Sequence, residues 1–256
     1  MSSTATFVLP ETDTLGPLDA PDGLHLVAPE RVRALGRIVV LAPHADDESL
    51  GCGGLLALAA AAGTRPHVVL LTDGTMSHPN SPSYPAPRLR ALREAEMAAA
   101  CHALGATLTA LRHPDCDLPA PGDPQFAGAV RDLARAIGPA DTLLVPWRRD
   151  PHCDHHATWR LARHAVGHLG RAVRWIEYPV WAWTRLGEPE APRADEAAAW
   201  RLDVSSVLPA KRRAVAAHRS QTTDLIADDP DGFCLAPDML AIFDRPYELF
   251  LEPHDV

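Results

Sequence analysis

Short runs of β-branched and aliphatic residues alternate along the chain with longer segments rich in Ala and Leu. The short runs predict buried strands at residues 37–42, 67–72, 107–111, 142–145, 172–178 and 201–205. The longer segments predict helices at residues 49–62, 88–104, 125–137, 156–167 and 209–220. Strands that alternate with helices of this length indicate an α/β fold with a mostly parallel central sheet.

The parts of the chain without periodicity lie at the N-terminus and after the second predicted strand. Residues 1–30 are rich in Pro, Asp and Thr, and we interpret them as an N-terminal arm that either packs on the body or stays mobile. Residues 75–87 contain four prolines and predict a long loop, which in a compact domain is usually functional. Without an internal repeat or a low-complexity linker, residues 1–256 are expected to form one domain.

Composition narrows the class of protein. The chain has 24 Lys and Arg against 33 Asp and Glu, a net charge of -9, which disfavours a nucleic-acid partner. No stretch approaches the roughly 18–20 apolar residues that cross a bilayer. The first residues have no basic region ahead of an apolar one, so we expect no secretory signal. The five cysteines have no CxxC spacing, which favours buried apolar thiols in a reduced cytoplasm over a disulfide framework.

Histidines and carboxylates gather in two short segments that follow predicted strands. Residues 43–48 read Pro-His-Ala-Asp-Asp-Glu after the first strand, and residues 150–156 read Asp-Pro-His-Cys-Asp-His-His after the fourth. Because ligands of open parallel sheets bind outside the carboxyl ends of the strands, we expect both segments at one edge of the sheet. Two histidines and a carboxylate there would bind a divalent cation, although spacing alone does not separate His155 from His156 as a ligand.

Three further side chains suit the chemistry of a metal-activated water. Asp46 stands between the presumed ligands His44 and Asp47 and is the natural general base. His152 would stabilise an oxyanion or protonate a leaving amine, and Asp154 would orient an imidazole. Acidic residues after a strand are, taken singly, more often helix N-termini. The two segments together favour a metal site.

The pairing of these segments resembles the LmbE-like, or PIG-L, family of zinc-dependent N-deacetylases. Those enzymes carry an (A/P)HPDDE segment and an HPDH segment on a Rossmann-like, three-layer α/β fold. Further matches are Thr-Asp-Gly at 72–74, Arg-Glu-Ala-Glu at 93–96, Leu-Gly at 104–105, and Lys211, His218 and Gln221. The resemblance covers residues 37–250, but Ala45 and Cys153 stand where the family usually has proline.

The resemblance implies one zinc ion per chain with three ligands, namely His44, Asp47 and His155. It implies Asp46 as general base, and His152 as the group that stabilises the oxyanion and protonates the leaving amine. Arg93 corresponds to an arginine that reaches the substrate, and Asp73 and His78 are further substrate-binding candidates. The expected reaction removes an N-acyl group, first of all acetyl, from an N-acylated amino sugar or glycoside of small size.

Several alternatives stay open on the sequence. The same His and Asp cluster suits a metal-dependent phosphoesterase, which would hold two ions about 3.5–4 Å apart. A third hypothesis is a protein that has lost its catalytic activity and only binds a ligand. The aromatic residues Tyr178, Trp181 and Trp183 fit either a wall against a sugar ring or the core. Asp115, after the third strand, is a further pocket candidate, and assembly into a homo-oligomer is left open.

Overall fold

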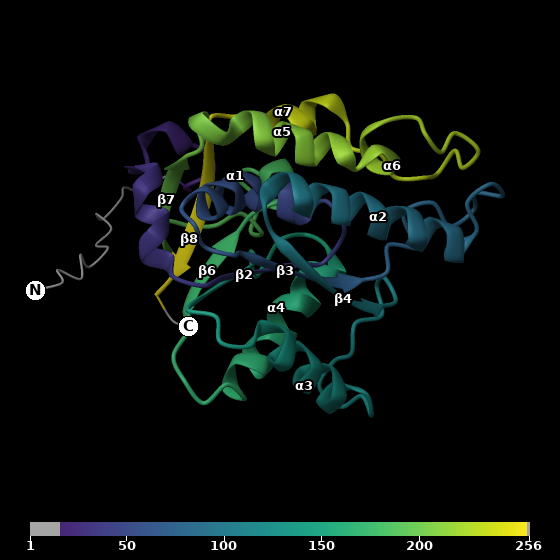
Figure 1. Ribbon diagram of the computed structural model, residues 1–256, viewed down its shortest axis with the longest axis horizontal. Coiled ribbons are helices and arrows are strands. Elements are labelled where there is room, and N and C mark those ends of the chain that lie inside the picture. The colour runs from purple at the N-terminus through teal and green to yellow at the C-terminus, as the bar shows by residue number, and fades with distance from the viewer. Residues whose placement is uncertain (1–15, 255–256) are drawn as a thin grey trace, which may run out of the picture.

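An eight-stranded sheet runs through the molecule in the order β1-β7-β8-β6-β5-β2-β3-β4 (Figure 1). The computed structural model describes residues 16–254. The strands are β1 (Leu26–Val27), β2 (Ile38–Ala42), β3 (His67–Thr72), β4 (Thr107–His113), β5 (Thr142–Pro146), β6 (Arg174–Tyr178), β7 (Ala197–Asp203) and β8 (Tyr247–Pro253). Among the strands of residues 16–254, only β8 pairs antiparallel, with β6 and β7, so the prediction of a mostly parallel sheet is confirmed.

Helices cover both faces of the sheet. They are α1 (Asp47–Ala61), α2 (Ala86–Leu104), α3 (Phe126–Ile137), α4 (Cys153–Gly167), α5 (Leu208–Ala217), α6 (Arg219–Thr222) and α7 (Pro237–Phe243). Figure 1 shows α3 and α4 on one face and α1, α2, α5 and α7 on the other. This arrangement is the expected three-layer α/β fold. No helix within residues 16–254 combines the length and apolar character needed to span a membrane.

The central strand β2 shows why its sequence is continuously apolar. Val39 and Leu41 belong to the core under α3 and α4, whereas Ile38, Val40 and Ala42 belong to the core under α1 and α2. Successive side chains of a strand point to opposite faces, so a parallel strand covered on both sides has no solvent-facing position.

The strand order reverses next to β2. From β2 the chain moves through α1 to β3 and through α2 to β4, and α3 then returns it to β5 on the other side of β2. Such a reversal leaves a crevice at the carboxyl ends of the two central strands. The segments at residues 43–48 and 150–156 follow β2 and β5, so the topology brings them together.

Several boundaries differ from the predictions. The strand expected at 201–205 is β7 (Ala197–Asp203), and the helix expected at 209–220 ends at Ala217 and restarts as α6. Helix α7 and the strands β1 and β8 were not predicted. Residues 1–15 of the expected arm lie outside the described residues. Its remainder packs on the body, since Leu18 is buried and β1 pairs with β7.

Candidate active site

Three donor side chains from the two motif segments converge at the crevice. His44 lies in the turn after β2, Asp47 is the first residue of α1, and His155 lies in the first turn of α4. Nδ1 of His44 and Nε2 of His155 each lie 3.3 Å from Oδ2 of Asp47. His155 and Asp47 are buried, and the His44 side chain is only 13% exposed. The fold therefore gathers the three predicted ligands at one point.

The other ring nitrogen of each histidine contacts a further aspartate, a different one for each ring. Nε2 of His44 is 2.9 Å from Oδ2 of Asp154, and Nδ1 of His155 is 2.6 Å from Oδ2 of Asp150. Such partners fix the tautomer of a ligating histidine, so that the near nitrogen presents its lone pair to the cation. Asp154 was predicted in this orienting role. Asp150 was not, although it is the first residue of the second segment.

The donor set fits a divalent cation. Nδ1 and Nε2 of His155 are both buried, and within residues 16–254 neither has a hydrogen-bond partner of regular geometry beyond its ion-pair contact with Asp150 or Asp47. Burial alone would lower the pKa of both histidines, but Asp154 and Asp47 raise the pKa of His44 to about 9. Asp47 and Asp150 likewise raise the pKa of His155 to about 10. The site thus favours positive charge at its centre, and two imidazoles with one carboxylate form a common catalytic zinc set.

Asp46 meets the requirements of a general base. Its backbone has φ 140°, a conformation that residues other than glycine rarely adopt, and its amide donates to Oε2 of Glu48 at 3.1 Å. Burial raises the pKa of Asp46 to about 6, although Arg93 favours the ionised form. A carboxylate with this pKa is ionised at neutral pH and accepts a proton more readily than an ordinary aspartate.

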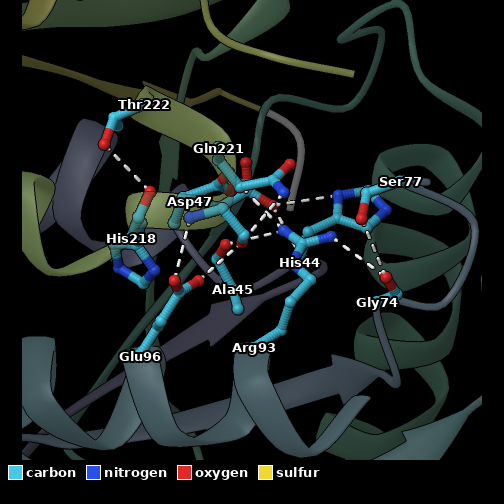
Figure 2. A network of polar contacts seen from close by, with 12 residues as sticks. His44, Ala45, Asp47, Gly74, Ser77, Arg93, Glu96, His218, Gln221 and Thr222 are labelled. Carbon is cyan, nitrogen blue, oxygen red and sulfur yellow. Dashed lines mark hydrogen bonds and ion pairs between the residues drawn. The ribbon is translucent and has the colours of Figure 1, made fainter. Parts of the chain in front are cut away.

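Arg93 contacts both the carboxylate of Asp46 and the backbone next to it. Its side chain comes from α2, and its Nη2 donates to the carbonyl of Ala45 at 2.8 Å (Figure 2). The same Nη2 lies 3.6 Å from Oδ2 of Asp46. Its Nη1 donates to the carbonyl of Gly74 at 3.4 Å. Gly74 has φ +71°, and a Cβ there would lie 2.8 Å from Cδ of Arg93. The Thr-Asp-Gly sequence therefore ends in glycine because the arginine passes against its backbone.

His152 is presented as a neutral hydrogen-bond donor. Its Nδ1 accepts the backbone N–H of Asp154 at 3.2 Å, which caps α4 and places the proton of the neutral ring on Nε2. Burial and the neighbouring His44 and His155 lower the pKa of His152 to about 4. Its ring is stacked beside Trp181 at a centroid distance of 6.5 Å.

These side chains open into a cavity of about 310 Å³. Its polar wall includes Ser77, Arg93, Asp115 and Gln221, and its apolar wall includes Met76, Trp181, Phe233 and Leu235. Trp181 and Phe233 meet edge to face at 5.5 Å. Among the aromatic residues at 178–183, only Trp181 lines this cavity. Tyr178 is a core residue whose hydroxyl donates to the carbonyl of Leu41 at 2.6 Å.

Two predicted substrate-binding residues stand apart from the cavity wall. Asp73 accepts hydrogen bonds from the amide and hydroxyl of Thr75, at 3.2 and 2.8 Å, and so shapes the turn after β3. His78 is buried, only 4% exposed, in the loop beside Gly232. Neither lines the cavity, whereas the neighbouring Ser77 does.

The cysteines depart from the prediction of buried thiols. Cys52 and Cys101 are buried, but Cys116, Cys153 and Cys234 are exposed. The sequence-based prediction was wrong for these three because they lie in loops or at a helix start, outside the packed layers. All five are free thiols.

Comparison with known proteins places this site in a family. The sequence profile of PIG-L, GlcNAc-PI de-N-acetylase, matches residues 39–166, which include both motif segments. The 2'-N-acetylparomamine deacetylase of Streptomyces fradiae is 32% identical over 221 residues, covering 76% of this chain and 76% of the relative. The chain belongs to the PIG-L family. The LmbE-like resemblance is thereby confirmed.

Other matches agree with this PIG-L assignment. A probable N-acetyl-alpha-D-glucosaminyl L-malate deacetylase 2 of Bacillus cereus is 27% identical over 199 residues, covering 75% of this chain and 86% of the relative. The solved N,N'-diacetylchitobiose deacetylase from Pyrococcus horikoshii has the same fold, with a TM-score of 0.60 at 22% identity over 85% of this chain and 84% of that one. The curated relatives hydrolyse N-acetyl amide bonds. They give no support to the phosphoesterase alternative.

Proposed function

We propose that this PIG-L protein is a zinc-dependent N-deacetylase of a small amino-sugar-containing molecule. The observation that carries the proposal is the meeting of His44, Asp47 and His155 at one point, with Asp46 and His152 on the cavity side. One zinc ion per chain would be held by those three ligands. The two curated relatives are named as deacetylases of acetylated amino-sugar compounds, which supports the substrate class.

A bound divalent cation would lower the pKa of the attacking water and polarise the acyl carbonyl. Asp46 takes the proton that this water loses as it attacks, because its carboxylate lies in the cavity wall and is ionised at neutral pH. Arg93 holds that carboxylate in place and balances its charge.

His152 then stabilises the oxyanion of the tetrahedral intermediate. Its Nε2–H donates a hydrogen bond to the negatively charged oxygen of the tetrahedral intermediate. A neutral imidazole that gave up this proton would become an anion, so His152 is a poor proton donor to the leaving amine. Asp46 carries the proton it has accepted, and we assign delivery to the amine to Asp46 rather than to His152.

The cavity suits one sugar-sized ring. Its apolar wall, with Trp181 and Phe233, offers a face for the ring carbons, and Ser77 and Gln221 offer hydrogen-bonding groups for hydroxyls. Sugar recognition commonly combines such an aromatic face with a few polar groups. The roles of Asp73 and His78 as substrate ligands and the cytoplasmic location stay predictions, and a homo-oligomeric state stays open.

The test is an assay of free amine released from a panel of N-acetylated amino sugars, each measured with and without a chelator. We expect release from at least one substrate, its loss with chelator and its recovery with Zn²⁺, together with one bound ion per chain. No release from any substrate at full zinc occupancy would contradict the amino-sugar assignment. Two ions per chain, with release of phosphate from phosphate esters, would favour the phosphoesterase instead.

A further inference from the structure

Two exposed thiols lie side by side at the rim of the active-site cavity. Cys116 follows β4 and Cys153 begins α4, yet their Sγ atoms are 3.0 Å apart. Cys116 lines the cavity, and both side chains reach solvent. The sequence gives no sign of this pair, because the two residues are separated by 37 positions and share no motif.

The carboxylate of Asp154 lies next to the two thiols. Oδ1 and Oδ2 of Asp154 each accept the backbone N–H of Cys116 at 3.0 Å. One donor atom from each of Cys116, Cys153 and Asp154 lies within 4.8 Å of the other two. The carboxylate of Asp115 adds negative charge on the same side, since its donor atom lies within 4.8 Å of donor atoms of His44 and Asp154.

We propose that Cys116, Cys153 and Asp154 form a second cation site, which takes a soft divalent ion such as Zn²⁺ or Cd²⁺. It shares no ligand with the site of His44, Asp47 and His155. Two thiolates select soft or borderline ions over Mg²⁺ and Ca²⁺, and the exposed side leaves a position for water. Each thiol releases its proton to solvent as the ion binds.

Occupation of this second site inhibits the enzyme, a consequence that rests on the proposed function. Asp154 is the carboxylate that holds Nε2 of His44 at 2.9 Å. An ion bound to Asp154 competes for that oxygen and loosens the orientation of His44 as a ligand. Loss of such a carboxylate partner typically costs about 10- to 100-fold in metal affinity or activity.

The chain offers a variant that removes one thiol with little disturbance. Cys153 is the first residue of α4, where proline is well tolerated, and it stands where the family usually has proline. His152 before it is extended, with φ -138° and ψ 134°, which is the conformation that a following proline requires. We therefore expect Cys153→Pro to keep the fold and the basal activity. Cys234→Ser, at an exposed thiol outside the cluster, is the matched control.

The experiment titrates the zinc-loaded enzyme with Cd²⁺ under reducing conditions. It follows thiolate-to-cadmium charge-transfer absorption, zinc retention and amide hydrolysis. The wild type and Cys234→Ser should bind a cadmium ion with this absorption while zinc is retained, and activity should fall about 10- to 100-fold. Cys153→Pro should show neither the absorption nor the inhibition.

Absence of the absorption in the wild type, or its persistence in Cys153→Pro, would overturn the site. Cadmium binding with full activity would overturn the inhibition. The absorption does not depend on turnover, so an enzyme without deacetylase activity would still reveal whether the site exists.

Discussion

Asp150 and His155 form the most buried contact of the candidate metal centre, with the Asp150 Oδ2 atom 2.6 Å from Nδ1 of the imidazole and both side chains fully enclosed. The carboxylate is itself fixed by backbone N–H groups of Val180, Trp181 and Ala182, at 3.3, 3.1 and 2.5 Å. The backbone at residues 180–182 thus orients a predicted metal ligand through Asp150.

Asp150→Asn should weaken metal binding. The amide keeps the shape of the carboxylate but removes the charge that fixes the His155 tautomer, so zinc affinity should fall about 10- to 100-fold. Competition with a chromogenic chelator measures this affinity. Unchanged affinity would show that Asp150 only supports the loop at 180–182.

Asp46→Asn should separate catalysis from metal binding. The amide cannot accept the proton of the attacking water, and removal of such a general base typically lowers kcat by about 10²- to 10⁴-fold. Zinc content measured on the same sample should equal that of the wild type, because Asp46 is proposed as the base and not as a ligand. Full activity with reduced zinc content would assign Asp46 to metal binding instead.

Gly74→Ala should disturb Arg93, and the chain provides its control. Gly74 and Gly63 both have positive φ, +71° and +85°, but a Cβ at Gly63 meets nothing within 4 Å. Both substitutions should cost about 1–2 kcal/mol of stability for the strained backbone. Only Gly74→Ala should also reduce kcat, since its Cβ displaces the side chain that holds Asp46. Equal kcat values for the two variants would mean that Arg93 adapts without cost to catalysis.

Lys211→Met should destabilise the fold. Lys211 is the only lysine of the chain, and its buried Nζ donates to Glu248 at 2.7 Å and to the carbonyl of Leu50 at 2.8 Å. Glu248 also accepts the backbone N–H groups of Gly54 and Leu55, at 2.6 and 2.8 Å. Removing one partner of such a pair typically costs about 3–5 kcal/mol, because the other charge stays buried.

Chemical denaturation measures the loss in Lys211→Met. Arg212→Met is the control, since Arg212 belongs to the same helix but forms an exposed pair with Asp244. That variant should stay within about 1 kcal/mol of the wild type. Similar stabilities for the two variants would contradict a structural role for the buried pair.

The sequence alone determined the strand and helix pattern and the chemistry of the site. Runs such as residues 38–42 are apolar at every position because both faces of the strand are covered, and that pattern is local. The ligands and the base lie in two short segments, each placed at a strand end by the chain itself. For this reason His44, Asp46 and Asp47 could be predicted before any coordinates, and the family resemblance then favoured His155 over His156.

Only the tertiary structure decided which partner each supporting group meets; the sequence predicted Asp154 to orient an imidazole but not which one. His44 meets Asp154 across 110 positions, Lys211 meets Glu248 across 37, and Cys116 meets Cys153 across 37. The partner of a polar group in such contacts is set by loop paths and by the antiparallel insertion of β8, which leave no periodic signal in the sequence. Periodicity reports which face of an element is buried, whereas a polar contact depends on the exact position of two atoms brought together by the whole fold.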